Sequence, residues 1–137
     1  MEQDSKKKED FRWPLDDHFR IIPKLKTDLT PFFERVSMNV NQRLLEIDVR
    51  ERKDFAVLNW IMDLADDENE EALTFISHDG DGKILCMLVF ENISLIHHEC
   101  TFQKGVGGAF GINTGDTAVH EIHVTYKKME RVREPKV

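Results

Sequence analysis

The order of patterns between residues 54 and 126 restricts the possible folds more than any other feature. Apolar residues first recur at helical spacing, and a short strand pattern then leads into Asp-Gly-Asp-Gly at 79–82. Asp-Gly pairs favour the tight turns that β-hairpins need. Two long strand patterns, a glycine-rich segment and a final alternating strand complete the order. This order predicts an α+β fold: a small antiparallel β-barrel or sandwich packed against one amphipathic helix.

Two segments alternate between polar and apolar residues, which predicts half-exposed strands. In the segment 44–50, one face holds Leu45, Ile47 and Val49. In the segment 117–127, one face holds Ala118, His120, Ile122, Val124 and Tyr126. The segment 84–90 is apolar on both faces, so we expect a central strand that is covered on both sides. These strands supply most of the predicted core.

The predicted helix covers residues 54–65, with Asp54 as its N-cap. Its apolar stripe comprises Phe55, Leu58, Ile61, Met62 and Ala65, and Trp60 and Leu64 widen it. Spacing of three and four residues places such a stripe on one face of a helix. We therefore predict that the helix packs against the sheet through Phe55, Leu58, Trp60, Ile61 and Met62.

The chain of 137 residues is long enough for one hydrophobic core. We predict a flexible arm at 1–10, a single domain at 11–128 and a tail at 129–137. Between 11 and 43 the pattern is short and broken by prolines. It predicts an extended piece at 19–23 and one helical turn at 28–36, with Thr30 as its cap and Pro31 at its first position.

The net charge of −7 is unevenly distributed. Residues 1–10 carry −1 and residues 127–137 carry +3, so the body of the chain carries −9. This charge argues against a protein that wraps nucleic acid, because affinity for phosphates comes from Lys and Arg. It is compatible with a surface that nucleic acid passes without binding, and equally with solubility alone. No apolar run reaches eighteen residues and the N-terminus lacks an apolar signal region, so we expect no membrane span and synthesis in the cytoplasm.

The cysteines and histidines form no recognisable catalytic or metal-binding pattern. With a turn at Glu91-Asn92, Cys86 and Cys100 are too far out of register for a disulfide, so we expect two buried free thiols. A bridge between subunits stays as the alternative. His120 and His123 are three apart, which puts them on opposite faces of a strand. Without a Cys-x-x-Cys pair or a fourth ligand, we predict no metal, no cofactor and no enzymatic activity.

Two further sequence motifs resemble ligand sites but fail on closer reading. A calcium loop that opens at Asp79 would need oxygen ligands where Lys83 and Phe90 stand. The Gly-x-Gly-Gly at 105–108 would need a helix after it to bind phosphate, and a strand pattern follows instead. Both motifs therefore favour hairpin turns.

The order of elements resembles the tail-tube proteins of contractile-tailed bacteriophages and the related hexameric tube protein of type VI secretion. The resemblance rests on the strand 44–50, the helix segment Leu58-Asn59-Trp60-Ile61, the turn at 78–82 and the strand 119–126. It covers about the last two-thirds of the chain. Residues 11–43 depart from the family, which usually has a long N-terminal strand and an extended loop there.

The resemblance implies a structural virion protein rather than an enzyme. Copies would form a homo-oligomeric ring, with six as the expected number, and rings would stack into a tail tube with an acidic lumen for the passage of DNA. Glu46, Asp48 and Glu121 are the expected lumen residues. The expected ring-to-ring contacts are Trp13, Gly105, Gly107, Gly108, Phe110 and Gly111. The expected location is the virion tail, after assembly in the host cytoplasm.

The expected partners are other copies of the chain, the tail sheath and the baseplate, with DNA passing through unbound. Two alternatives remain open at this point. The chain is either the major tube subunit or a tube-like baseplate, initiator or terminator protein. From a different class, a cytosolic α+β module that binds a protein through its sheet also fits the patterns.

Overall fold

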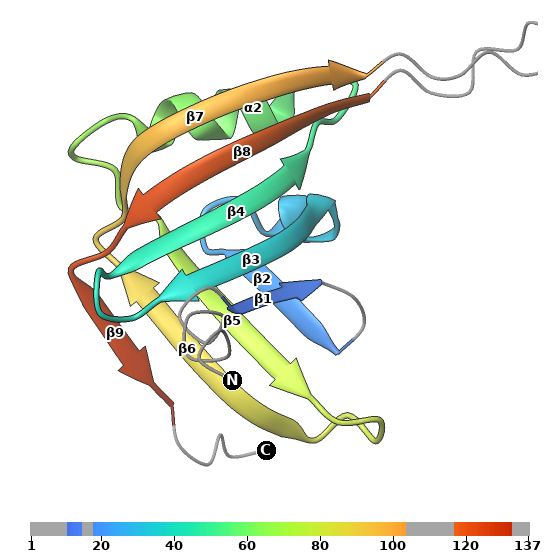
Figure 1. Cartoon of the computed structure of the whole chain (residues 1–137), viewed down its shortest axis with the longest axis vertical. Helices are drawn as coiled ribbons and strands as arrows, with labels where there is room; N and C mark the ends of the chain where they lie inside the picture. Colours follow the sequence, from blue (N-terminus) through green and yellow to red (C-terminus); the bar gives the residue numbers. More distant parts are fainter. Residues whose placement is uncertain (1–10, 15–17, 104–116, 133–137) are drawn as a thin grey trace, which may run out of the picture.

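The computed structural model consists of two antiparallel β-sheets that face one another, with a helix beside them (Figure 1). It describes residues 11–14, 18–103 and 117–132. Within this part the sheets stay separate and do not close into a barrel. The α+β prediction and its sandwich form are therefore confirmed, and the barrel form is not.

The first sheet, sheet A, has five strands and the second, sheet B, has four. In spatial order, sheet A comprises β1 (Phe11–Pro14), β3 (Phe33–Asn39), β4 (Leu44–Arg50), β8 (Thr117–Thr125) and β7 (Ser94–Gln103). Sheet B comprises β2 (Phe19–Pro23), β5 (Ala72–His78), β6 (Ile84–Glu91) and β9 (Lys128–Arg131). In Figure 1 the strands of the two sheets cross, and helix α2 (Ala56–Leu64) lies behind β7 and β8.

The core lies between the sheets, where the alternating strands place their apolar faces. Leu45, Ile47 and Val49 of β4 are fully buried, as the alternation predicted. On β8, Ile122 and Val124 are fully buried beside them. Apolar side chains line up on one side because successive side chains of a strand point to opposite faces. The polar side chains of both strands therefore point away from the core, except His120 of β8, which is buried.

The helix packs through a different face from the predicted one. Its buried residues are Val57, Trp60, Ile61 and Leu64, whereas Phe55 and Met62 are 53% and 63% exposed and Leu58 is half-buried. Trp60 and Ile61 are confirmed as core residues, and the assignment of Phe55, Leu58 and Met62 to the core is wrong. Apolar residues occur around most of this helix, so spacing alone could not select the buried arc.

The start of the helix also differs from the prediction. Phe55, in the left-handed region at φ 60°, precedes the first helical residue, and Asp54 is not the N-cap. Asp54 still accepts a hydrogen bond from the Ala56 N–H at 3.1 Å. The carboxylate of Glu51 accepts the next N–H groups, as described below.

The turn at 79–82 forms a hairpin between β5 and β6, as predicted. Gly82 has φ 87°, and Asp79 Oδ1 accepts hydrogen bonds from the N–H groups of Asp81 and Lys83. Strand β6 has neighbours on both sides, but only Phe90 is buried along it. Leu85 is 62% exposed, so β6 is not covered on both faces within one chain, and cover by a neighbouring subunit stays a prediction.

Strands β6 and β7 do not pair, although the sequence suggested a hairpin between them. Asn92, with φ 59°, lies where the chain leaves sheet B and enters sheet A. Cys86 on β6 therefore lies opposite Ser77 on β5 in sheet B. Cys100 on β7 lies opposite His120 on β8 in sheet A. The two cysteines are free, as expected, but both are only half-buried and the register argument used for them was wrong.

The segment 27–39 and the C-terminal segment contain more secondary structure than predicted. Residues 27–32 form a short 3₁₀ helix, in which Thr30 Oγ1 donates to the Thr27 carbonyl instead of capping the turn. The chain then continues as β3, which the proline-broken pattern concealed. At the other end, β9 pairs with β6, so the predicted boundary between residues 128 and 129 falls inside a strand.

We predict that Trp60→Ala lowers the free energy of unfolding by about 3–5 kcal/mol. Trp60 is 2% exposed, its ring meets Phe33 edge-on, and its Nε1 donates to Glu71 Oε2 at 2.8 Å. The substitution leaves a cavity and removes a buried hydrogen bond. Urea unfolding measures the loss.

Met62→Ala is the matched control on the same helix, because Met62 is 63% exposed. Its effect should stay within about 0.5 kcal/mol. Equal effects of the two substitutions would contradict the observed orientation of the helix.

Candidate functional site

The outer face of sheet A carries a compact group of polar side chains from adjacent strands. Because the apolar residues of β4 and β8 face the core, Glu46, Asp48, Glu121 and His123 point to the opposite side. Strand β3 adds Arg35 and Ser37 to this group. We call this surface the acidic face, and its carboxylates include the three that the sequence analysis assigned to a lumen.

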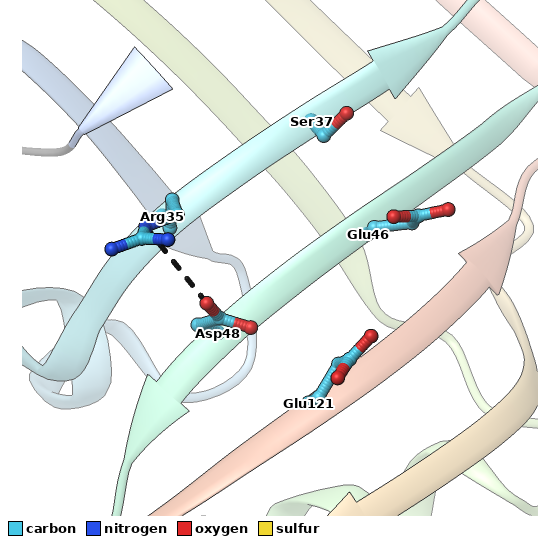
Figure 2. Close-up of a pocket in the computed structure, with 5 residues that line it drawn as sticks. All are labelled: Arg35, Ser37, Glu46, Asp48 and Glu121. Atoms are coloured by element: carbon cyan, nitrogen blue, oxygen red, sulfur yellow. Dashed lines mark ion pairs between the residues drawn. The ribbon is translucent and has the colours of Figure 1, made fainter. Parts of the chain in front are cut away.

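The register of the strands brings these residues together. Asp48 lies directly opposite Glu121, and Glu46 lies directly opposite His123. On the other side of β4, Glu46 faces Ser37. A small hollow forms at this point, lined by Arg35, Ser37, Glu46, Asp48 and Glu121 (Figure 2). Residues that are 75 positions apart in the sequence, such as Glu46 and Glu121, therefore line one hollow.

Strand pairing places like charges of the acidic face opposite one another. Glu121 lies opposite Asp48 on one side and opposite Glu99 of β7 on the other. Like charges directly opposite one another destabilise a sheet. Arg35 Nε lies 4.0 Å from Asp48 Oδ2 in a half-exposed ion pair (Figure 2), which offsets part of this repulsion. His123 Nε2 lies 2.9 Å from Glu121 Oε2.

The acidic face also contains a set of metal-ligand types. One oxygen each from Glu46 and Glu121 and one nitrogen of His123 all lie within 4.8 Å of one another. Among the described residues, these three side chains are the group close enough together to bind one metal ion. The pattern along a single strand does not reveal this set, because Glu46 joins it from the neighbouring strand β4.

A second polar cluster lies on the core side of sheet A. His120 Nε2 lies 2.6 Å from Glu51 Oε1, and His120 Nδ1 lies 2.8 Å from His98 Nε2. The side chains of His120 and Glu51 are 2% and 6% exposed. The rings of His98 and His120 stack with centroids 5.0 Å apart. The three side chains form a continuous hydrogen-bonded chain from the helix to the edge strand β7.

Glu51 stands at the start of this chain and stabilises the helix. Its Oε2 accepts the N–H groups of Arg52 and Val57, and its Oε1 accepts the N–H of Leu58. The first N–H groups of a helix lack partners within the helix, and the helix dipole favours a negative charge there. One buried carboxylate therefore connects the N-terminus of α2 to β8.

In the buried cluster, the carboxylate of Glu51 contacts the imidazole of His120, which in turn contacts the imidazole of His98. Burial, followed by the nearby charges of His120 and His97, lowers the pKa of His98. Cys100 lies beside His120 in the register, and burial together with the charge of Glu51 raises the pKa of its thiol. A thiol with a raised pKa holds little thiolate at neutral pH, so Cys100 is a poor nucleophile.

The structure locates some of the predicted site residues and not others. Glu46, Asp48 and Glu121 lie together on the acidic face. Trp13 belongs to β1, at the edge of sheet A. The predicted contact residues Gly105, Gly107, Gly108, Phe110 and Gly111 lie outside the described residues. As expected, His120 and His123 point to opposite faces, which separates them into the two clusters.

Glu51 and its link to His98 were missed from the sequence. The available signal was a Glu five residues before the first residue of the helix, in a chain whose strand 117–127 carries a His on its apolar face. A polar residue on an apolar face needs a buried partner. Finding that partner requires the pairing of β4, β8 and β7, which the sequence does not state.

We predict that acidification destabilises the fold through His98. Its pKa is lowered in the folded state, so below about pH 6.5 the unfolded chain takes up the proton first. The free energy of unfolding should therefore be fully retained above the unfolded pKa. It should fall as the pH falls from there toward the lowered folded pKa. Thermal unfolding across this range measures the change.

His98→Gln is the comparison for this measurement, because its amide occupies the place of the imidazole Nε2 without titrating. The variant should lose less stability on acidification than the wild type, with both referenced to their own stability at about pH 8. Parallel curves would show that His98 does not carry the effect.

Comparisons of the chain with known protein families, with curated protein sequences and with solved structures found no match. Within the described residues, no helix has the length and apolar character needed to cross a membrane.

Proposed function

We propose that the chain is a structural subunit of a tube made of stacked rings, of the kind found in the tails of contractile bacteriophages. The single observation that carries the proposal is the acidic face. Glu46, Asp48 and Glu121 were assigned to a lumen from sequence, and they lie on one outer face of sheet A. A continuous wall of such faces repels the phosphate backbone, so that DNA passes without binding.

Open sheet edges support an assembly of this kind. Within the described residues, β7 pairs only with β8 and β1 pairs only with β3, so these two strands form the edges of sheet A. An edge strand offers unpaired N–H and C=O groups to another chain. In the proposed ring, β7 of one copy pairs with the β1 edge of the next, and ring closure removes both edges.

The edge strand β7 of sheet A also carries exposed apolar side chains. Ile96 and Phe102 of β7 are 58% and 75% exposed. Large exposed apolar groups along an edge strand favour burial against a partner. In the proposed ring this partner is a neighbouring copy, which covers the two side chains when the sheets join.

Further exposed apolar side chains lie on sheet B and, separately, at the helix. Leu85 of β6 is 62% exposed, and Phe55 and Met62 at the helix are similarly exposed. In the tube proposal these residues contact the sheath or baseplate. These exposed side chains also favour the second candidate function, a cytosolic module that binds another protein. A tube-like initiator or terminator would also use both sets of exposed side chains, and the assembly experiment below separates these possibilities.

In the proposed tube, the residues expected from the sequence make the contacts between rings. Trp13 belongs to the edge strand β1. The segment with Gly105, Gly107, Gly108, Phe110 and Gly111 connects β7 to β8, which are neighbours in sheet A. These residues lie outside the described part of the chain, and their ring-to-ring role is proposed from the sequence alone.

We predict that concentrated protein forms rings or tubes and that Ile96→Lys suppresses them. A lysine on an edge strand opposes edge-to-edge pairing, and Ile96 is exposed, so the fold should be kept. Light scattering and electron microscopy of purified protein at millimolar concentration measure the assembly.

Met62→Lys is the matched control for this substitution, because Met62 has a similar exposure but lies on α2. It should assemble into rings like the wild type. A wild-type protein that stays monomeric at millimolar concentration would refute the tube and leave the binding module. Rings that do not stack would favour an initiator or terminator.

We predict that assembled wild-type tubes do not retain DNA, whereas tubes with Glu46→Lys, Asp48→Lys and Glu121→Lys do. The substituted side chains point away from the core, so tubes should still form. A basic wall binds phosphates by releasing counterions, so retention should weaken strongly between about 50 and 200 mM salt. Sedimentation of tubes with a labelled duplex measures retention. Equal retention by wild-type and triple-variant tubes would show that the acidic face does not line the lumen.

A further inference from the structure

We propose that Glu46, Glu121 and His123 bind one divalent transition-metal ion, with zinc as the best match. The three side chains lie on the acidic face, and their ligand atoms are within 4.8 Å of one another. This inference does not depend on the tube, because the three ligands come from one copy of the chain.

The sheet geometry explains why these three side chains meet. Glu121 and His123 are two apart on β8 and therefore share a face. Glu46 is the direct cross-strand partner of His123 on β4. The set thus forms three corners of a small triangle on one sheet surface, held by the backbone hydrogen bonds between two interior strands of sheet A.

The spacing suits an ion after small side-chain adjustments. Ligands of a tetrahedral zinc ion lie about 2.0–2.2 Å from the metal, so they are about 3.4 Å from each other. His123 Nε2 and Glu121 Oε2 are already 2.9 Å apart. The Glu46 oxygen lies within 4.8 Å of the other two ligand atoms, so rotation of its flexible side chain brings it to ligand distance.

The charges of the acidic face favour a cation at this point. Asp48 and Glu121 oppose one another, and Glu99 opposes Glu121 from the other side. Among the described residues, Arg35 lines the hollow and pairs with Asp48. A dication between Glu46 and Glu121 offsets the repulsion that the register imposes.

The donor types distinguish this set from a solvated acidic patch. Calcium and magnesium prefer oxygen donors, whereas an imidazole nitrogen beside carboxylates suits zinc and similar transition metals. Three protein ligands leave a fourth position for water or for a carboxylate. Asp48 lines the same hollow, opposite Glu121, and is the candidate carboxylate for that place.

The surroundings of His123 fix the orientation of its ring. His97 of β7 is its cross-strand partner, and the two rings are 4.8 Å apart between centroids. The side chain of His123 is 24% exposed, compared with 43% for His97. A ligand that is packed in this way loses less side-chain entropy when it binds an ion.

Isothermal titration of the chelator-treated full chain with zinc tests the proposal. We expect one ion per chain with a micromolar or tighter dissociation constant, and a melting temperature that rises with zinc concentration. His123→Gln and Glu121→Gln should each weaken zinc binding roughly tenfold or more. Calcium and magnesium should bind far more weakly than zinc.

His78→Gln is the control, because His78 belongs to β5 of sheet B and is not part of the set. It should bind zinc within about twofold of the wild type. Circular dichroism confirms that each variant is folded. No saturable zinc binding, wild-type affinity in His123→Gln, or equal affinity for calcium and zinc would each overturn the proposal.

The outcome for the metal is separable from the outcome for the tube. Titration is done at low protein concentration, where it reports only on ligands within one chain. Tubes without zinc binding would remove the metal and keep the tube. Zinc binding by a protein that stays monomeric at high concentration would do the reverse.

Discussion

The strict alternation of side chains along β4 and β8 is the constraint on which the rest of the structure depends. One face of each strand supplies fully buried residues such as Ile47 and Ile122, and the other supplies the carboxylates of the acidic face. A slip of one residue in the pairing would bury those carboxylates and expose the core. The hydrophobic core therefore fixes the register, and the register in turn fixes which charged groups stand opposite each other.

A single carboxylate then joins the helix to this sheet. Glu51 is nearly fully buried, and burying a charge without partners is costly. Here it accepts three backbone N–H groups and faces His120 at 2.6 Å, so its negative charge is well compensated. The chain of contacts continues to His98 on β7. The helix, the interior strand β8 and the edge strand β7 are thus coupled through hydrogen-bonded side chains.

The two proposals for the acidic face depend on different physical properties of the same residues. Repulsion of DNA depends on the net charge of a wall and is screened over about 10 Å at ordinary salt. Metal binding depends on three ligand atoms within 4.8 Å and on the nitrogen of His123. One bound dication would reduce the negative charge of each face without changing the fold. If both properties hold, metal concentration would adjust how strongly the face repels DNA.

The sequence by itself determined the elements whose signals are local. The strands 44–50 and 117–125, the turn at 79–82 and the existence of a helix after residue 54 follow from periodicity and turn chemistry, and each is present. The outward direction of Glu46, Asp48 and Glu121 follows from the same alternation. These features need only the neighbours of a residue along the chain.

Only the tertiary structure decided the features that depend on pairing between distant segments. It selected the buried arc of α2 around Trp60 and Ile61, because apolar residues covered most of the helix. It sent β6 and β7 to different sheets, and it brought Glu46 beside His123 and Glu51 beside His120. Local patterns state which face of a strand is apolar, but they do not state which strand lies next to it. The register between distant strands is set by the packing of the whole core, and it is this register that created both polar clusters.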